Sequence, residues 1–570
     1  MLILKAALFG FSSLGYWEVL RSKTETNVYF LPILTVAIQS CLLILGGLVN
    51  ALGAAAWGVF FLGFALLGWM LWQEKGRNWR YYRSWGYGFF LVGILLTAIY
   101  LRSKVFTHND NFTHWAIVVK RLLTSDRFPI LTDTEIGFPY YPLGSSVYIY
   151  YFCKMIGRSE PMQMLAQSYM MLASFLALFA CAKRSCAVAG AVLTCVVAMI
   201  FGYSIRINEL LVDTLLPLVG MAAVLYVLVT FSRDETRPTP GRHAVWVLIP
   251  LLVWLAQIKN SGMLFSYLAV ALLIFYPRWD MGQLWQKLAA AAAPAVGNFL
   301  WSSHCAGVFP QELQEKHAMT AGNYAETFAE KTTENMIWIA EKTVRFMLSR
   351  EGVFWILVWL AMLGLLTFLL RSAMKKQYFW LLGSVAVMHV VYMAGMVGMY
   401  LFSMPIDEAM GLASIERYSR TLDIAVYYLI TSYGFCLISK AERKAFAALA
   451  GGALMLLSVA TVKEMPDSRP WMTLDHRISV ERNIREYGIE ANCSYYICIP
   501  EYDDHHYFKL VHNFLLGKMP VAQKITDAAQ LEEARGYDYL INMDVDNPII
   551  QTWIAENYPD QAGASVITDP

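Results

Sequence analysis

The chain has 570 residues, of which 57% are hydrophobic and 15% are charged. Soluble globular domains carry about 25% charged residues, so this composition excludes an ordinary soluble protein and indicates a chain that crosses a membrane many times. The formal net charge is only +2, and no basic domain or binding motif is present, so we expect no nucleic-acid partner.

Apolar segments long enough to cross a bilayer recur through the first 460 residues or so. A spanning helix needs about 20 residues with few charges. Residues 28–73 carry no charge and are long enough for two such helices, with a break expected near "NALGA". The stretch 1–20 is a less apolar candidate because it contains Lys5 and Glu18. The further candidates bring the total to about 13 or 14, and they are 84–101, 162–182, 186–203, 210–231, 244–257, 262–276, 286–304, 353–370, 378–402, 421–438 and 444–462.

Lysine and arginine collect in short loops that alternate with longer acidic or mixed loops. Cytoplasmic loops of membrane proteins carry an excess of Lys and Arg, so the side with the short basic loops is predicted to be cytoplasmic. The long loops 102–161, 305–352 and 403–420 then face outside, together with everything after residue 463.

Three outer segments have patterns of their own. Residues 324–348 place apolar side chains at helical spacing between charges, which predicts a helix along the outer surface. Residues 143–157 are apolar but too short to span, so we expect them to dip into the outer leaflet. Residues 464–570 change in composition and predict a small extracytoplasmic α/β domain. The chain therefore divides into a transmembrane domain over residues 1–463 and this C-terminal domain.

Three acids are the first candidates for chemistry. Asp110 stands in "HNDNFTHW", shortly after the span at 84–101, where it is a solvated loop acid, the N-cap of a helix or a functional acid. Asp133 and Glu135 follow in "TDTEIGFPYYPLGSS", where solvated loop acids are the alternative interpretation.

Polar groups within or at the ends of spans are costly and therefore more informative. Asp213 lies in "LLVDTLLPLVG", and Lys259 lies in a predicted tight turn, "LAQIKNSGML". Snorkelling to the surface is the alternative for that lysine. The stretch "ERYSR" places Arg417, Tyr418 and Arg420 just before a late span. Two arginines on the outer side run against the positive-inside bias, and the planar guanidinium suits a phosphate; an Arg–Glu pair that ties loops together is the alternative.

A metal site is not predicted. The stretch "DDHHYF" (503–508) contains acids and histidines, but adjacent histidines on a strand point to opposite faces, and no second cluster has ligand spacing. Phosphate-binding glycine loops and His-Glu-x-x-His patterns are also missing from the sequence.

Taken in order, these motifs resemble the GT-C superfamily of integral-membrane glycosyltransferases, in the group of bacterial dolichyl-phosphate-mannose-type and aminoarabinose-type transferases. The resemblance is carried by "HNDNFTHW", the "YYPLG" turn, "VDTLL", "KNSG" and "ERYSR", and covers residues 84–462. The spans before residue 84 depart from the simplest members, in which the acid loop follows the first span. The acid stands as "NDN" and not as a paired acidic dipeptide, so a second carboxylate or a divalent metal stays an open question.

The resemblance implies a glycosyltransferase of cell-envelope glycosylation, on the outer face of the bacterial cytoplasmic membrane. Its donor would be a polyprenyl-phosphate-linked sugar, and its acceptor a glycan, a lipid or a protein. Asp110 would take the proton of the acceptor hydroxyl, while Arg417, Lys259 and Tyr418 would bind the donor phosphate. Direct displacement would invert the anomeric centre. The accessory candidates are Asp133, Glu135, Asp213 and Arg420.

Three alternatives stay open at this point. A transporter or lipid-glycan flippase would have similar span numbers, although inverted repeats and polar breaks near the bilayer midplane are typical of transporters, and the sequence shows neither. A ligase or polymerase of lipid-linked glycans would keep the fold and the large outer loops. A non-catalytic structural membrane protein is the third.

Overall fold

The computed structural model describes residues 1–73, 79–182, 187–203, 207–231, 241–275, 284–310, 321–369, 374–441, 444–464, 474–500 and 505–570. The chain forms two compact units. Unit 1 comprises Met1–Lys104, Ser125–Phe128 and Tyr140–Ser468, and unit 2 comprises Val105–Thr124, Pro129–Pro139 and Arg469–Pro570. Two pieces of the first large loop therefore belong to the same unit as the C-terminal region.

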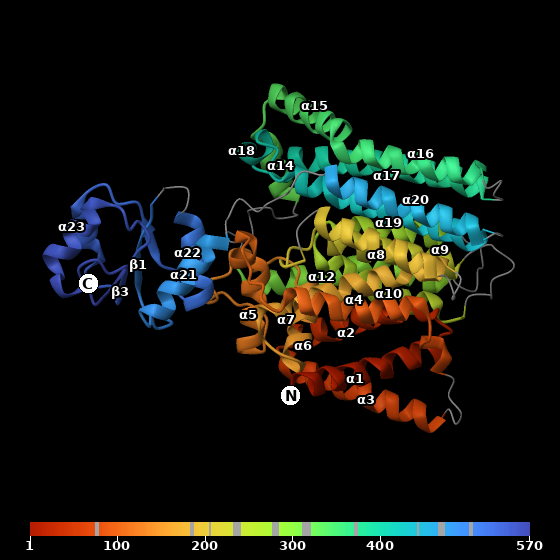
Figure 1. Cartoon of the computed structure of the whole chain (residues 1–570), viewed down its shortest axis with the longest axis horizontal. Helices are drawn as coiled ribbons and strands as arrows, with labels where there is room; N and C mark the ends of the chain where they lie inside the picture. Colours follow the sequence, from red (N-terminus) through yellow and green to blue (C-terminus); the bar gives the residue numbers. More distant parts are fainter. Residues whose placement is uncertain are drawn as a thin grey trace. The chain divides into compact units, whose positions relative to one another are not determined.

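Unit 1 is helical, and its long helices run side by side (Figure 1). Its first helices are α1 (Leu2–Lys23), α2 (Leu31–Leu48), α3 (Leu52–Gln73), α4 (Trp85–Leu101), α6 (Gly144–Met155), α7 (Glu160–Leu176), α8 (Ala187–Tyr203), α9 (Leu215–Thr230), α10 (Ala244–Ile258), α11 (Gly262–Phe275) and α12 (Leu284–Val308). The later ones are α14 (Ala321–Ala329), α15 (Thr333–Ser349), α16 (Glu351–Leu369), α17 (Lys375–Phe402), α18 (Ile406–Met410), α19 (Ile415–Lys440) and α20 (Lys444–Glu464).

Except for α14, α15 and α18, these helices coincide with the apolar segments identified in the sequence. The predicted break at "NALGA" lies between α2 and α3, where Asn50 adopts a left-handed conformation with φ of 56°. Asparagine tolerates that conformation better than most residues. Parts of the short basic loops that supported the predicted orientation lie outside the described residues, at 74–78, 183–186, 232–240, 276–283, 370–373 and 442–443.

Among the described residues, seven helical segments are long and apolar enough to cross a membrane. They are Val28–Leu48, Leu52–Gln73, Glu160–Cys181, Glu351–Leu369, Lys375–Phe402, Ile415–Lys440 and Lys444–Thr461. Five apolar helices (α4, α8, α9, α10 and α11) are shorter. At 1.5 Å per residue, the 14 residues of α11 extend about 21 Å, less than the roughly 30 Å of a bilayer core. Several long apolar helices are what a multi-pass membrane protein requires.

Two segments from the predicted outer side differ in detail from expectation. Helix α6 matches the short apolar segment 143–157, and nearly all its side chains are buried against α2, α7 and α10. Its composition is therefore explained by burial in protein. The single helix expected over 324–348 is instead two helices, α14 and α15. Thr332 separates them and caps α15 by accepting a hydrogen bond from the Asn335 amide (3.2 Å).

Unit 2 combines helix α5 (Ala116–Ser125), most of which belongs to it, with a small sheet and helices from the C-terminal region. In its described part the sheet has the order β2-β1-β3-β4, in which β1 pairs parallel with β2 and β3, and β4 pairs antiparallel with β3. A small C-terminal sheet region is thus confirmed. The elements are α21 (Leu474–Glu486), β1 (Tyr495–Cys498), α22 (His505–Leu516), β2 (Val521–Gln523), β3 (Tyr539–Asn542), α23 (Pro548–Asn557) and β4 (Val566–Thr568).

The interpretation of "DDHHYF" as strand was wrong. His505 and His506 begin α22, and the two acids before them lie outside the described residues. The helix follows from the positions of Tyr507, Val511 and Phe514, which are three and four residues apart and are all buried.

Candidate functional site

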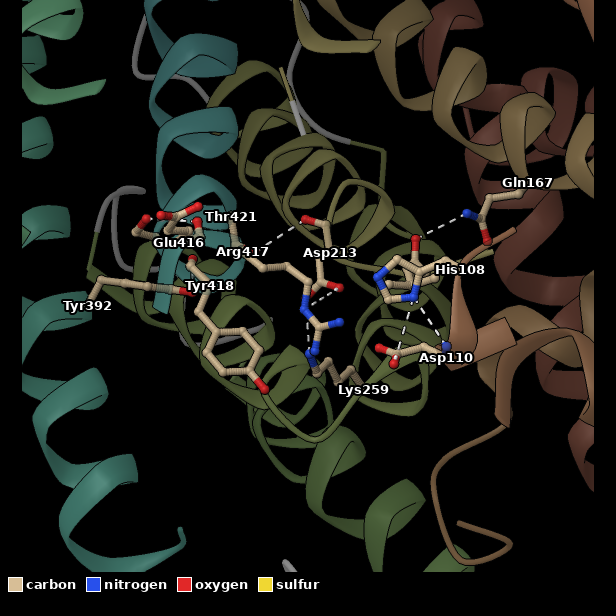
Figure 2. Close-up of polar contacts among 12 residues, drawn as sticks. His108, Asp110, Gln167, Asp213, Lys259, Tyr392, Glu416, Arg417, Tyr418 and Thr421 are labelled. Atoms are coloured by element: carbon tan, nitrogen blue, oxygen red, sulfur yellow. Dashed lines mark hydrogen bonds and ion pairs between the residues drawn. The ribbon is translucent and has the colours of Figure 1, made fainter. Parts of the chain in front are cut away.

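One acidic and two basic side chains meet in unit 1 (Figure 2). Asp213 lies in the turn before α9, Lys259 follows the last residue of α10, and Arg417 lies in the first turn of α19. Lys259 Nζ is 3.1 Å from Asp213 Oδ1, and Arg417 Nε is 3.6 Å from Asp213 Oδ2. The structure thus brings together three residues that the sequence identified separately.

The position of Lys259 depends on a tight turn between α10 and α11. Lys259 has extended backbone angles, and its carbonyl oxygen accepts a hydrogen bond from the Gly262 amide (2.7 Å). A Cβ atom on Gly262 would lie 2.0 Å from the carbonyl oxygen of Leu255. Only glycine therefore fits this position, and the predicted turn at "KNSG" is present.

The start of α19 is held by hydrogen bonds to two other segments. Just before it, Leu412 and Ser414 adopt left-handed conformations, with φ of 48° and 59°, which are costly for residues other than glycine and often mark functional sites. The Thr421 hydroxyl donates to the Asp213 carbonyl oxygen (3.3 Å), and the Tyr392 hydroxyl donates to the Tyr418 carbonyl oxygen (2.8 Å).

Burial divides the three charges into an inner and an outer set. The Asp213 side chain is 4% exposed, whereas those of Lys259 and Arg417 are 22% and 21% exposed. A buried carboxylate is costly without partners, and the two cations neutralise it. The more accessible side chains of these three residues are therefore the two basic ones.

Tyr418 contributes an aromatic surface beside both cations. Its ring centroid is 4.9 Å from Lys259 Nζ and 5.4 Å from Arg417 Cζ. Such cation–π contacts contribute about 0.5–1 kcal/mol each at exposed sites. Arg420, three residues after Arg417, is half-buried on the same helix. The arrangement suits an anionic group with several acceptor oxygens, because guanidinium and ammonium groups both donate to phosphate.

A second ion pair supports the same helix and was missed in the sequence. Arg350 Nη1 lies 2.5 Å from Asp423 Oδ2 and also donates to the Ser419 carbonyl oxygen (3.0 Å). Both side chains are buried. The sequence did contain a signal for Arg350, since it is another arginine on the predicted outer side of a span, the argument that singled out Arg417.

Asp110 belongs to unit 2, which is described by itself. It precedes a π-helical turn, Asn111–Trp115, that continues into α5, and such turns occur often at functional sites. Its amide donates to His108 Nδ1 (3.1 Å), while Asp110 Oδ1 lies 3.7 Å from the same nitrogen. Because Nδ1 accepts the amide hydrogen, it bears no proton, and we do not regard the 3.7 Å contact as an ion pair. The Asp110 side chain is 31% exposed.

His114, in the same turn, is buried and therefore uncharged near neutral pH. Burial lowers the pKa of His114 to about 3, and the negative charge of Asp110 and a hydrogen bond to the Phe138 backbone offset only part of this effect. The imidazole of His114 therefore packs within the turn as a neutral group and adds no positive charge beside Asp110 near neutral pH.

The other two acids of the loop meet at Arg121 in unit 2. Asp133 is buried, forms an ion pair with Arg121 and accepts a hydrogen bond from the Ile130 amide (2.9 Å). Glu135 Oε1 lies 3.8 Å from Arg121 Nε. These contacts fit a structural role for Asp133 in particular.

The described residues contain no group of three His, Cys, Asp or Glu side chains arranged to hold a metal ion. The chain was compared with protein-family models, curated proteins and solved structures. None of these comparisons found a match. The chemistry of the site is therefore the basis for assigning a function.

Proposed function

We propose that the protein is a GT-C-like integral-membrane glycosyltransferase, which moves a sugar from a polyprenyl-phosphate donor to a glycan, lipid or protein acceptor on the outer face of the bacterial cytoplasmic membrane. The proposal includes about 13 or 14 spanning helices, with the long loops and the C-terminal region outside the cell. Its main support is the Asp213–Lys259–Arg417 cluster, in which the two cations are more exposed than the carboxylate.

A lipid-linked phosphate fits both the cluster and its surroundings. The cluster lies at the ends of apolar helices. Within unit 1, the cations could therefore bind the charged headgroup of a lipid, and the apolar helices could contact its tail. Nucleotide sugars do not occur outside the cytoplasmic membrane, and a donor used there has to arrive on a lipid.

The reaction is a displacement at the anomeric carbon. The acceptor oxygen forms the new bond to this carbon, and the bond to the phosphate oxygen breaks with both electrons passing to the polyprenyl phosphate. Lys259 and Arg417 stabilise the negative charge that develops on the phosphate. Asp110 takes the proton from the acceptor hydroxyl, a role that suits a carboxylate on a partly exposed turn.

The test is binding of polyprenyl phosphate, compared with the polyprenol that lacks the phosphate, to purified protein in detergent. The wild type is expected to bind the phosphate more tightly. Lys259→Gln and Arg417→Gln should each weaken phosphate binding about 10- to 100-fold, as expected for loss of a hydrogen bond to a charged group, and leave polyprenol binding unchanged.

Arg345→Gln is the matched control, because Arg345 is an exposed arginine of unit 1 that pairs only with Glu341 among the contacts described (2.6 Å). It should bind as the wild type does. Equal affinity of the wild type for phosphate and alcohol would contradict the proposal, as would retention of the difference in the Lys259→Gln/Arg417→Gln double variant.

A further inference from the structure

The segment that carries Asp110 packs against the C-terminal region, within unit 2. Lys120 and Phe514 are separated by 394 residues in the sequence, yet Lys120 Nζ donates a hydrogen bond to the Phe514 carbonyl oxygen. Asn513 Nδ2 likewise donates to the carbonyl oxygen of Glu135 (3.3 Å). Both pieces of the loop in unit 2 are therefore attached to the end of α22.

An aromatic cluster lies directly beside the Asp110 turn. Phe112, two residues after Asp110, is fully buried, and its ring centroid is 5.2 Å from that of Phe514 and 5.9 Å from that of Tyr507. Phe106, at the start of the same segment, also contacts Phe514 (6.2 Å). These contacts bury the apolar side of the turn that begins at Asp110.

Arg477 of α21 completes the cluster. Its side chain is fully buried, and its Cζ atom is 5.6 Å from the ring centroids of both Phe112 and Phe514. Glu481, one turn later on α21, pairs with the guanidinium at 2.8 Å and 3.0 Å. The charge is thus compensated, and the flat guanidinium can stack on both rings, which the ammonium group of a lysine cannot reproduce.

We propose that Arg477 and Phe514 are positioning residues for Asp110. They anchor Phe112, Phe112 fixes the π-helical turn, and the turn sets the position of the Asp110 carboxylate. The C-terminal region is then part of the catalytic machinery and not an independent appended module. The effect on sugar transfer rests on the proposed function, whereas the anchoring of the loop can be measured without any activity.

The first measurement is hydrogen–deuterium exchange of the full-length protein in lipid nanodiscs. Arg477→Ala and Phe514→Ala should increase exchange in peptides from residues 105–124 and leave the helices of unit 1 unchanged. Arg477→Lys should have an intermediate effect because it keeps the charge but loses the stacking. Arg485→Ala, on an exposed arginine of the same helix, is the control and should match the wild type.

The second measurement is transfer from a radiolabelled polyprenyl-phosphate hexose to a membrane extract. A displaced base lowers kcat, since small misplacements of a catalytic group cost up to about 100-fold. The KM for the donor should stay constant, because the proposed phosphate ligands Lys259 and Arg417 belong to unit 1. The order of kcat should be wild type and Arg485→Ala first, then Arg477→Lys, then Arg477→Ala.

Each outcome is decisive for a different statement. Unchanged exchange at 105–124 in both alanine variants overturns the anchoring. Increased exchange with an unchanged kcat overturns the positioning role. If β1 and β3 also lose protection from exchange in an alanine variant, that substitution has unfolded unit 2. The exchange and kcat of Arg477→Lys then decide the question. Absence of transfer by the wild type is a failure of the proposed function, and the exchange data still test the anchoring.

Discussion

Removing one partner of the buried Arg350–Asp423 pair should strongly destabilise unit 1. Arg350 donates to both the Asp423 carboxylate and the Ser419 carbonyl oxygen, and the two charged side chains are 7% and 1% exposed. Arg350→Met leaves a buried carboxylate without its main partner, which costs about 3–5 kcal/mol. Asp423→Leu leaves a buried guanidinium and should cost a similar amount.

The double variant distinguishes a desolvation penalty from ordinary loss of packing. Replacing both members of a buried pair by apolar residues is often neutral, so Arg350→Met/Asp423→Leu should be more stable than either single variant. The free energy of unfolding of the wild type, the two single variants and the double variant can be measured from the loss of helicity in mixed SDS–detergent micelles, which completes a double-mutant cycle. Arg345→Ala removes the exposed ion pair with Glu341 and should change the free energy of unfolding by less than about 0.5 kcal/mol. The prediction is wrong if a single variant lies within about 1 kcal/mol of the wild type, or if the losses of the two single variants simply add in the double variant.

Three further predictions concern the turn, the buried histidines and the topology. Gly262→Ala forces a Cβ atom to within 2.0 Å of a carbonyl oxygen and should destabilise unit 1 by about 1–3 kcal/mol in the same unfolding assay; a stability equal to that of the wild type would contradict it. Burial lowers the pKa values of His114 and His512 to about 3 and about 4. In the unfolded state these histidines have an ordinary pKa near 6.5, so on acidification they bind protons before those of the folded state do, and unit 2 should lose stability as the pH falls from about 7 to about 4. Hydrogen exchange of unit 2 that is the same at pH 7 and pH 5, after correction for the intrinsic exchange rate, would argue against this. In intact cells, and in a variant whose nine native cysteines are replaced by serine, a membrane-impermeant maleimide should label Ser349→Cys but not Gln73→Cys. The reverse pattern would contradict the proposed orientation.

Local pattern was sufficient for most of the helices. The uncharged runs, the break at Asn50 and the turn at Lys259 could all be predicted, because they depend on residues close in sequence. The prediction of a single helix over 324–348 was wrong at Thr332. This residue is the N-cap of α15, and an N-cap within an amphipathic stretch interrupts the helix without changing the spacing of the apolar residues.

The relations between distant residues could not be predicted. Asp213, Lys259 and Arg417 were each identified by charge at the end of a span, but their mutual contacts depend on how α9, α10 and α19 pack. The same holds for the packing of Phe112 against Arg477, because a phenylalanine in a loop gives no indication of its partner hundreds of residues later.

Sugar transfer itself is the most direct test of the proposed function. Purified protein is incubated with radiolabelled polyprenyl-phosphate hexoses or pentoses and a membrane or wall extract, for the wild type and for folded Asp110→Asn. The expected result is transfer by the wild type and its collapse in Asp110→Asn. Transfer that survives the substitution would contradict the assignment of Asp110 as the base. If no donor supports transfer and the protein instead mediates vesicle uptake or lipid flipping, the proposal that it is a glycosyltransferase is wrong.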